Sequence, residues 1–220
     1  MMVRSLKFWG LYTIEGIGIA VGIGLLLYFY LLIQMPEGLV KGFFENLALY
    51  PYYLLVAGSF YTMMYVMSCF QVYYSLLVSM NVTRKAAVLG IVASTGIVVT
   101  ALILIMWVIW KLVPGEVSRS GLGIFHLCSG ILFLVTGVML LLGVVIAKWG
   151  KIGTIITILI AGIGGGCMGA SVAMMGEDMT EVLLKMAEHN FLIVFVIGIA
   201  VFAAAGGFVM AVSRKLEVRR

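Results

Sequence analysis

AAVLGIVASTGIVVTALILIMWVIW, residues 86–110, contains no charged side chain over its whole length. A helix needs roughly 20 apolar residues to cross the hydrocarbon core of a bilayer. Stretches of the same kind lie before and after it, and only helices satisfy their own backbone hydrogen bonds in lipid over such lengths. We therefore expect an all-α membrane protein with six transmembrane helices. The predicted spans are about 9–34, 52–80, 86–110, 121–147, 152–175 and 190–212.

The composition of the whole chain agrees with this interpretation. Of its 220 residues, 64% are hydrophobic and only 10% are charged, and the mean hydropathy is +1.21. A soluble domain of this size could not bury so much apolar surface. No linker or low-complexity tract interrupts the pattern, so we expect residues 1–220 to form a single transmembrane domain.

The positions of the basic residues predict the orientation. Cytoplasmic loops of membrane proteins are enriched in Lys and Arg. If the N-terminus lies inside, only four of the 14 basic residues fall in outer segments, namely Lys41, Lys111, Arg119 and Lys185. Both termini are therefore predicted to be cytoplasmic. The net charge of +5 comes from this asymmetry, so it does not indicate binding to nucleic acid.

Polar side chains inside the spans are candidates for a functional role. Glu15 is the only carboxylate within a predicted span, and such acids are costly in lipid and usually face protein or water. A structural partner and a role in transport are both open for it. The second span carries a stripe of polar residues at spacings of three and four, which either bonds a neighbouring helix or lines a translocation path. These residues are Ser68, Gln71, Ser75 and Ser79.

Glycines recur at spacings that allow close contact between helices. Gly18 and Gly22 form a GxxxG motif in the first span, and two overlapping copies lie in the fifth. Glycine lets helix backbones approach each other closely in lipid, so we expect tight packing at these positions. A hinge that breaks the fifth helix is the alternative. The glycines in question there are Gly162, Gly165, Gly166 and Gly169.

A short amphipathic segment precedes the last span on the outer side. Asp178 followed by Glu181 is typical of a capping box, and apolar residues follow at helical spacing. We expect an amphipathic outer helix that either closes the top of the bundle or acts as an extracellular gate. Its apolar face would contain Met179, Val182, Leu183 and Met186.

The sequence contains no constellation typical of an enzyme. His126 and His189 have no Cys, His or carboxylate neighbour at a spacing that suits a metal, and no Walker A motif is present. Cys69, Cys128 and Cys167 lie within three different spans, where a thiol is usually a small packing residue. We therefore expect a non-enzymatic chain that holds no cofactor or metal itself.

The segment YYSLLVSMNVTRK, residues 73–85, joins the second and third predicted spans on the inner side. It resembles the corresponding segment of small ABC-2-type exporter permeases, where a coupling helix docks on an ATPase subunit. Asn81 stands where that family usually has glycine, but asparagine also tolerates the left-handed conformation. The resemblance implies a coupling helix between helices 2 and 3. The residues that match it are Asn81, Val82, Thr83, Arg84 and Lys85.

The same resemblance extends to the layout of the chain and implies a function. It implies a permease subunit of an ATP-driven exporter in the plasma membrane of a bacterium, paired with a second permease, identical or related. Two separate ABC ATPase subunits would bind the ATP and Mg²⁺. The cargo would be an amphipathic or hydrophobic peptide, lipid or drug, with antimicrobial-peptide export or immunity as the first expectation.

Other interpretations of the chain are open at this point. A six-helix substrate-binding membrane subunit of a vitamin-type importer would need a polar pocket near the outer face. A structural membrane protein would need no transport machinery at all. Arg84 and Lys85 would then be ordinary anchors at the cytoplasmic lipid surface.

Overall fold

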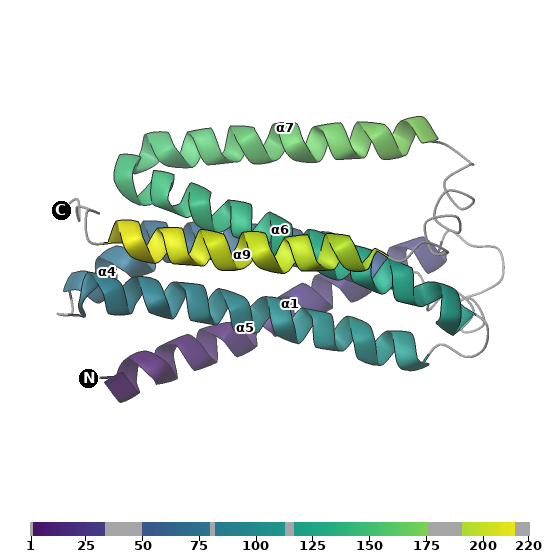
Figure 1. Ribbon diagram of the computed structural model, residues 1–220, viewed down its shortest axis with the longest axis horizontal. Coiled ribbons are helices and arrows are strands. Elements are labelled where there is room, and N and C mark those ends of the chain that lie inside the picture. Colours follow the sequence, from purple (N-terminus) through teal and green to yellow (C-terminus); the bar gives the residue numbers. More distant parts are fainter. Residues whose placement is uncertain (1, 34–49, 80–81, 113–116, 176–190, 214–220) are drawn as a thin grey trace.

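Figure 1 shows the computed structural model of the chain, whose described residues are 2–33, 50–79, 82–112, 117–175 and 191–213. Nearly every residue in these ranges is helical, and none of them lies in a strand, so the predicted all-α class is confirmed. The helices are α1 (Met2–Ile33), α3 (Tyr50–Ser68), the π-helix η2 (Cys69–Tyr73), α4 (Tyr74–Ser79), α5 (Arg84–Leu112), α6 (Val117–Trp149), α7 (Lys151–Met175) and α9 (Leu192–Val212).

Five of these helical segments are long and apolar enough to cross a membrane. They coincide with five of the six predicted spans and lie at Tyr12–Tyr30, Tyr53–Ser79, Arg84–Lys111, Leu122–Trp149 and Leu192–Val212. The predicted fifth span corresponds to α7, a helix of 25 residues in which Lys151–Ile163 forms a shorter apolar segment. The chain is therefore a multi-pass membrane protein.

The helices run roughly along one axis, and their ends alternate between the two ends of the bundle (Figure 1). The start of α1, the α4–α5 turn, the α6–α7 turn and the end of α9 all lie at the same end. The α6–α7 turn is tight because Gly150 has a φ of 59°, a left-handed conformation that glycine adopts without strain. Its amide donates a hydrogen bond of 2.7 Å to the Ile146 carbonyl, which ends α6.

The second span lies at the centre of the bundle, where α3 packs against α1, α5 and α6. The core there consists of large side chains that are almost fully buried, among them Leu54, Tyr65, Phe70, Leu102 and Leu132. Lipid tails are as apolar as leucine, so the association of these helices depends on close shape complementarity between their side chains.

The tightest pair of helices is α6 with α9, and glycines make their contact possible. A Cβ on Gly130 would lie 2.6 Å from the Val194 carbonyl oxygen, and one on Gly198 would collide with the Gly130 backbone. Gly123, Gly130 and Gly137 recur every seven residues on the buried side of α6. A seven-residue period keeps one face of a helix against its neighbour over several turns.

The glycines that the sequence singled out lie elsewhere. No atom lies within 4 Å of a Cβ built on Gly18, Gly22 or Gly162, so these positions make no close contact in the described part of one chain. In α1, the glycines in contact are Gly16, against Tyr61, and Gly24, against Leu54. The backbone of α7 continues as one α-helix through the remaining candidates, Gly165, Gly166 and Gly169.

The second span is not the uninterrupted α-helix that its sequence predicts. At η2 the Tyr74 amide donates its hydrogen bond to the Cys69 carbonyl, five residues back, rather than to the residue four back. π-Helical turns are rare and are frequently found at functional sites. This turn therefore makes residues 69–73 a candidate part of a functional site.

Candidate functional site

The candidate site is the inner segment, which we define as η2, α4, the following turn and the first residues of α5, that is, residues 69–85. It contains the only π-helical turn among the described residues and the sequence that resembles a coupling element. It also lies at the end of the bundle that holds the α6–α7 turn and the start of α1 (Figure 1).

A cluster of tyrosines joins this segment to α1. The Tyr12 ring stacks on the Tyr65 ring with centroids 5.2 Å apart, and it meets the Tyr73 ring edge-on at 4.8 Å. Tyr61 extends the cluster towards the middle of the membrane, 5.8 Å from Tyr65. The Tyr61 ring lies directly over Gly16, where any side chain would collide with it. The cluster thus fixes α1 against both sides of the π-helical turn.

Gln71 connects the π-helical turn to α7. Its Nε2 donates a hydrogen bond to Oγ1 of Thr154, and that hydroxyl donates to the Gly150 carbonyl at 3.2 Å. Hydrogen bonds of this kind hold neighbouring helices together in membranes. Since α7 packs mainly on α6, this bond is a direct polar link between the second span and the α6–α7 turn.

The other members of the polar stripe do not extend this link. Ser68 and Ser75 are half-buried, and the Ser79 hydroxyl donates to the Leu76 carbonyl of its own helix at 2.7 Å. The π-helical turn lies between Ser68 and Ser75, so the regular α-helical spacing does not hold across it. Within the described part of the chain, Gln71 is thus the member of the stripe whose side chain bonds to another helix.

The turn that follows presents two cations. The Val82 amide donates to the Leu77 carbonyl at 3.0 Å, and the Ala86 amide donates to the Thr83 hydroxyl at 3.3 Å. Thr83 is therefore the N-cap of α5. Arg84 and Lys85, the first two residues of that helix, are both exposed. Asn81 lies outside the described residues. The other residues of the expected coupling helix form no helix of their own, because Val82 and Thr83 are not helical and Arg84 and Lys85 begin α5, so this prediction is not confirmed.

Two further cations lie on the neighbouring turn. Lys148 and Lys151 flank Gly150 and are exposed, and both turns lie at one end of the bundle (Figure 1). We call these four residues, Arg84, Lys85, Lys148 and Lys151, the basic end. Such a concentration of cations is typical of the cytoplasmic side and suits an acidic protein surface or anionic lipid.

The remaining candidates lie away from the inner segment. Glu15 is exposed on α1, within the span Tyr12–Tyr30. The predicted outer gate residues, Met179, Val182, Leu183 and Met186, lie outside the described residues. At the far end of α5, the Lys111 ammonium lies 4.5 Å from the centroid of the Trp110 ring, as expected at a membrane interface.

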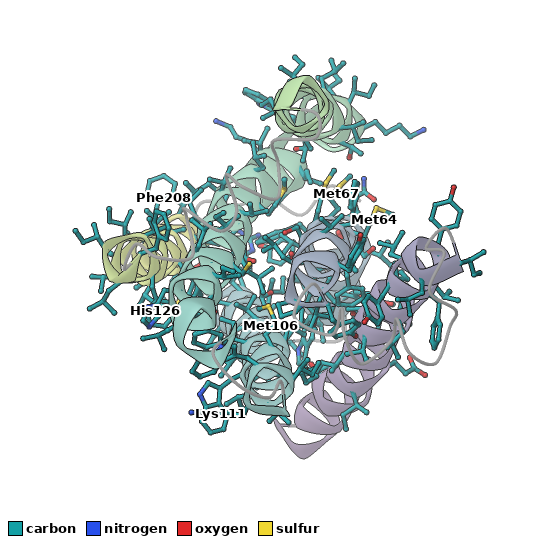
Figure 2. The ribbon with its side chains drawn as sticks, turned by 90° about the vertical axis from the view of Figure 1, so that its right-hand side faces the viewer. Met64, Met67, Met106, Lys111, His126 and Phe208 are labelled. Atoms are coloured by element: carbon teal, nitrogen blue, oxygen red, sulfur yellow. The ribbon has the colours of Figure 1, made fainter. Side chains whose placement is uncertain are left out.

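At the other end of the bundle, the described residues form no second group of polar or titratable side chains. Figure 2 shows His126 close to α9, where its ring lies 5.9 Å from that of Phe195. Met64 and Met67 lie on the side of α3 that faces α7 (Figure 2). Within the described ranges, no three His, Cys, Asp or Glu residues come together to form a metal site.

Sequence reasoning missed both the π-helical turn and the tyrosine cluster. The turn has no signal of its own, because the residues from Cys69 to Tyr73 include neither proline nor glycine. The tyrosine cluster does have a signal in the sequence, because Tyr61 and Tyr65 are four residues apart and so share a helix face.

No protein-family model, curated protein or solved structure matches this chain. The functional conclusion therefore depends on residues and geometry alone.

Proposed function

We propose that this chain is the transmembrane permease subunit of an ATP-driven exporter of the ABC-2 type, with six spans and cytoplasmic termini. The observation that supports this most is the exposed pair Arg84–Lys85 at the start of α5. A chain without a nucleotide site must receive the energy of ATP hydrolysis through such an element. In this proposal a soluble ATPase, which holds ATP and Mg²⁺, docks its acidic surface on Arg84 and Lys85 at the α4–α5 turn.

A single helix leads from the docking site into the membrane. Thr83 caps α5, and α5 continues for 29 residues, which is roughly 43 Å at 1.5 Å per residue. The helix packs against α1, α3 and α6, so a push on its first turn would act on the whole bundle. This arrangement suits the transmission of a motion across the membrane better than it suits an isolated anchor.

The π-helical turn is the element that we propose responds to this motion. In this proposal the turn with i→i+5 bonds returns to the α-helical pattern by a change of register; π-bulges are frequent at functional sites. Such a change would move Gln71 relative to Thr154 and Tyr73 relative to Tyr12. The cargo, an amphipathic or hydrophobic molecule, would cross between this chain and a second permease.

The test is co-purification from the native membrane in mild detergent. We expect an ATPase subunit, recognised by its Walker A peptide, to accompany the wild-type chain. The Arg84→Glu/Lys85→Glu variant should lose at least nine-tenths of it, on the order of the tenfold change that a 1.4 kcal/mol loss produces. The matched control is Lys148→Glu/Lys151→Glu, which makes the same charge change on the other turn of the basic end.

The outcomes separate the parts of the proposal. Loss of the ATPase in the first variant and retention in the second supports docking at the α4–α5 turn. Equal loss in both contradicts that specific site and leaves only a general attraction by charge. If no ATPase accompanies the wild-type chain, the exporter proposal is wrong.

A further inference from the structure

The side of the second span that faces α7 is not covered by α7. Figure 2 shows Met64 and Met67 on this side of α3, and Phe60 shares it because it lies four residues before Met64. The side chains of Met64 and Phe60 are 61% and 66% exposed. Helix α7 packs mainly on α6 instead. A groove therefore runs between the second span and α7.

One face of α7 forms the other wall of this groove. Lys151, Thr154 and Ile158 follow each other at spacings of three and four, so they share a face of α7. The hydrogen bond from Gln71 to Thr154 places this face toward the second span. Ile158, one turn beyond Thr154, is exposed, so the groove stays open past the bond. We call it the α3–α7 groove, lined by Phe60, Met64, Gln71, Lys151, Thr154 and Ile158.

The α3–α7 groove is polar at one end and apolar at the other. At the polar end, Lys151 is exposed and forms no ion pair with any described residue. Gln71 is exposed beside it, and its carboxamide keeps one N–H after donating the other to Thr154. Met64 and Phe60 lie seven and eleven residues before Gln71 in the chain, roughly 10 and 16 Å along the helix at 1.5 Å per residue.

Trp149 marks the depth of the polar end in the membrane. It lies between Lys148 and Lys151 in the α6–α7 turn, and its side chain is 45% exposed. Exposed tryptophans of membrane proteins sit at the level of the lipid head groups. Lys151 and Gln71 therefore lie near the phosphates, and Met64 and Phe60 lie among the acyl chains. The groove has the polarity of a phospholipid molecule in that leaflet.

We propose that the α3–α7 groove binds an anionic phospholipid of the leaflet at the basic end. Lys151 attracts the negative head group, and the remaining N–H of Gln71 donates to one of its oxygens. One acyl chain lies along Met64 and Phe60. Methionine is flexible and polarizable and is common on surfaces that accept varied apolar ligands, so it suits a mobile chain. The site rests on the proposed function only for the assignment of that leaflet as cytoplasmic.

The test is lipid binding to the full chain, purified in detergent and measured by native mass spectrometry. The two probes are dioleoyl phosphatidylglycerol and dioleoyl phosphatidylcholine, which have the same acyl chains and differ in net charge. We expect the wild-type chain to bind the anionic lipid about fivefold more tightly, as one lysine at a membrane surface provides. Lys151→Gln should abolish this preference. The matched control, Lys85→Gln, removes an exposed lysine of the basic end that lies outside the groove and should keep it.

A second pair of variants tests the apolar part of the groove. Met64→Trp fills the space in which the acyl chain is expected to lie. It should weaken the binding of both lipids about tenfold, the factor that corresponds to lost contact with about two methylene groups. The matched control is Met210→Trp on α9, where the methionine is 38% exposed, and it should leave both affinities unchanged. Size-exclusion profiles check that each variant is folded.

Equal affinity of the wild-type chain for the two lipids would overturn the proposal, as would a preference that survives Lys151→Gln. Equal effects of Met64→Trp and Met210→Trp would show that the chain does not lie in this groove. The site and the exporter assignment fail separately, because docking of the ATPase is assigned to Arg84 and Lys85. A chain that binds the anionic lipid but recovers no ATPase keeps the lipid site and loses the exporter assignment.

Discussion

Gly130 of α6 and Gly198 of α9 meet backbone to backbone, so that a Cβ on Gly198 would overlap the carbonyl group of Gly130. Neither helix can shift sideways to make room without losing its other contacts, since Gly137 packs against the Phe202 backbone two turns further along. Helices in lipid gain stability from this kind of close fit, because no hydrophobic driving force brings them together. We therefore predict that adding a side chain at Gly198 destabilises the bundle.

Gly198→Ala should destabilise the bundle by about 1–3 kcal/mol, the usual cost of adding a methyl group to a packed core. The matched control is Gly207→Ala on the same helix, where no atom lies within 4 Å of the added Cβ. Unfolding by heat or by SDS in detergent micelles measures the difference. An equal effect of the two substitutions would show that α6 and α9 do not make this contact.

The hydrogen bond from Gln71 to Thr154 should couple the second span to α7. In a double-mutant cycle of Gln71→Ala and Thr154→Val, we expect a coupling free energy of about 0.6 kcal/mol and up to about 1.7 kcal/mol, as in other membrane helices. Ser79→Ala replaces Gln71→Ala in the control cycle, because the Ser79 hydroxyl bonds only within its own helix. A coupling of zero in the first cycle would contradict the link.

Thr83 should stabilise the start of α5 through its hydroxyl, which accepts the Ala86 amide hydrogen bond. Replacing such an N-cap with alanine costs about 1 kcal/mol, whereas serine keeps the acceptor. We therefore expect Thr83→Ala to lower the free energy of unfolding in detergent by about that amount and Thr83→Ser to leave it nearly unchanged. Similar losses in both variants would mean that the methyl group, and not the cap, is what matters.

The two ends of α5 should lie on opposite sides of the membrane. Lys85 and Lys111 are exposed near the start and the end of this helix, and Lys148 lies at the same end of the bundle as Lys85. An impermeant thiol reagent added to intact cells should label a Lys111→Cys variant and neither Lys85→Cys nor Lys148→Cys. Labelling of all three, or of the opposite set, would contradict the proposed topology.

The sequence predicted the spans well because apolar length is what membrane crossing requires. Five of the six predicted segments lie where the structure has long apolar helices, including the span at Arg84–Lys111. The positions of the close helix contacts were harder to predict. The GxxxG motif predicted close packing at Gly18 and Gly22, but the same helix packs against α3 through Gly16 and Gly24. Both pairs have suitable spacing, and only the neighbouring helices decide which face is used.

The candidate site, too, could be predicted from the sequence only in part. Arg84 and Lys85 were recognisable as exposed cations from their place between two spans, and the structure has them on the first turn of α5. The π-helical turn at Cys69–Tyr73 was not recognisable, because it depends on how the second span fits between α1, α6 and α7. The seven-residue spacing of Gly123, Gly130 and Gly137 is visible in the sequence and indicates a helix face that can pack closely, as α6 does against α9.

The central claim is that an ATPase docks on the first turn of α5, and proximity crosslinking in native membranes tests it most directly. A photoreactive group attached to a Lys85→Cys variant should capture a protein whose peptides include a Walker A sequence. The same group on a Lys111→Cys variant, at the far end of the same helix, should not. Capture of that protein from Lys85→Cys alone is the result that we predict, and its absence there, or equal capture at both ends, would contradict the account.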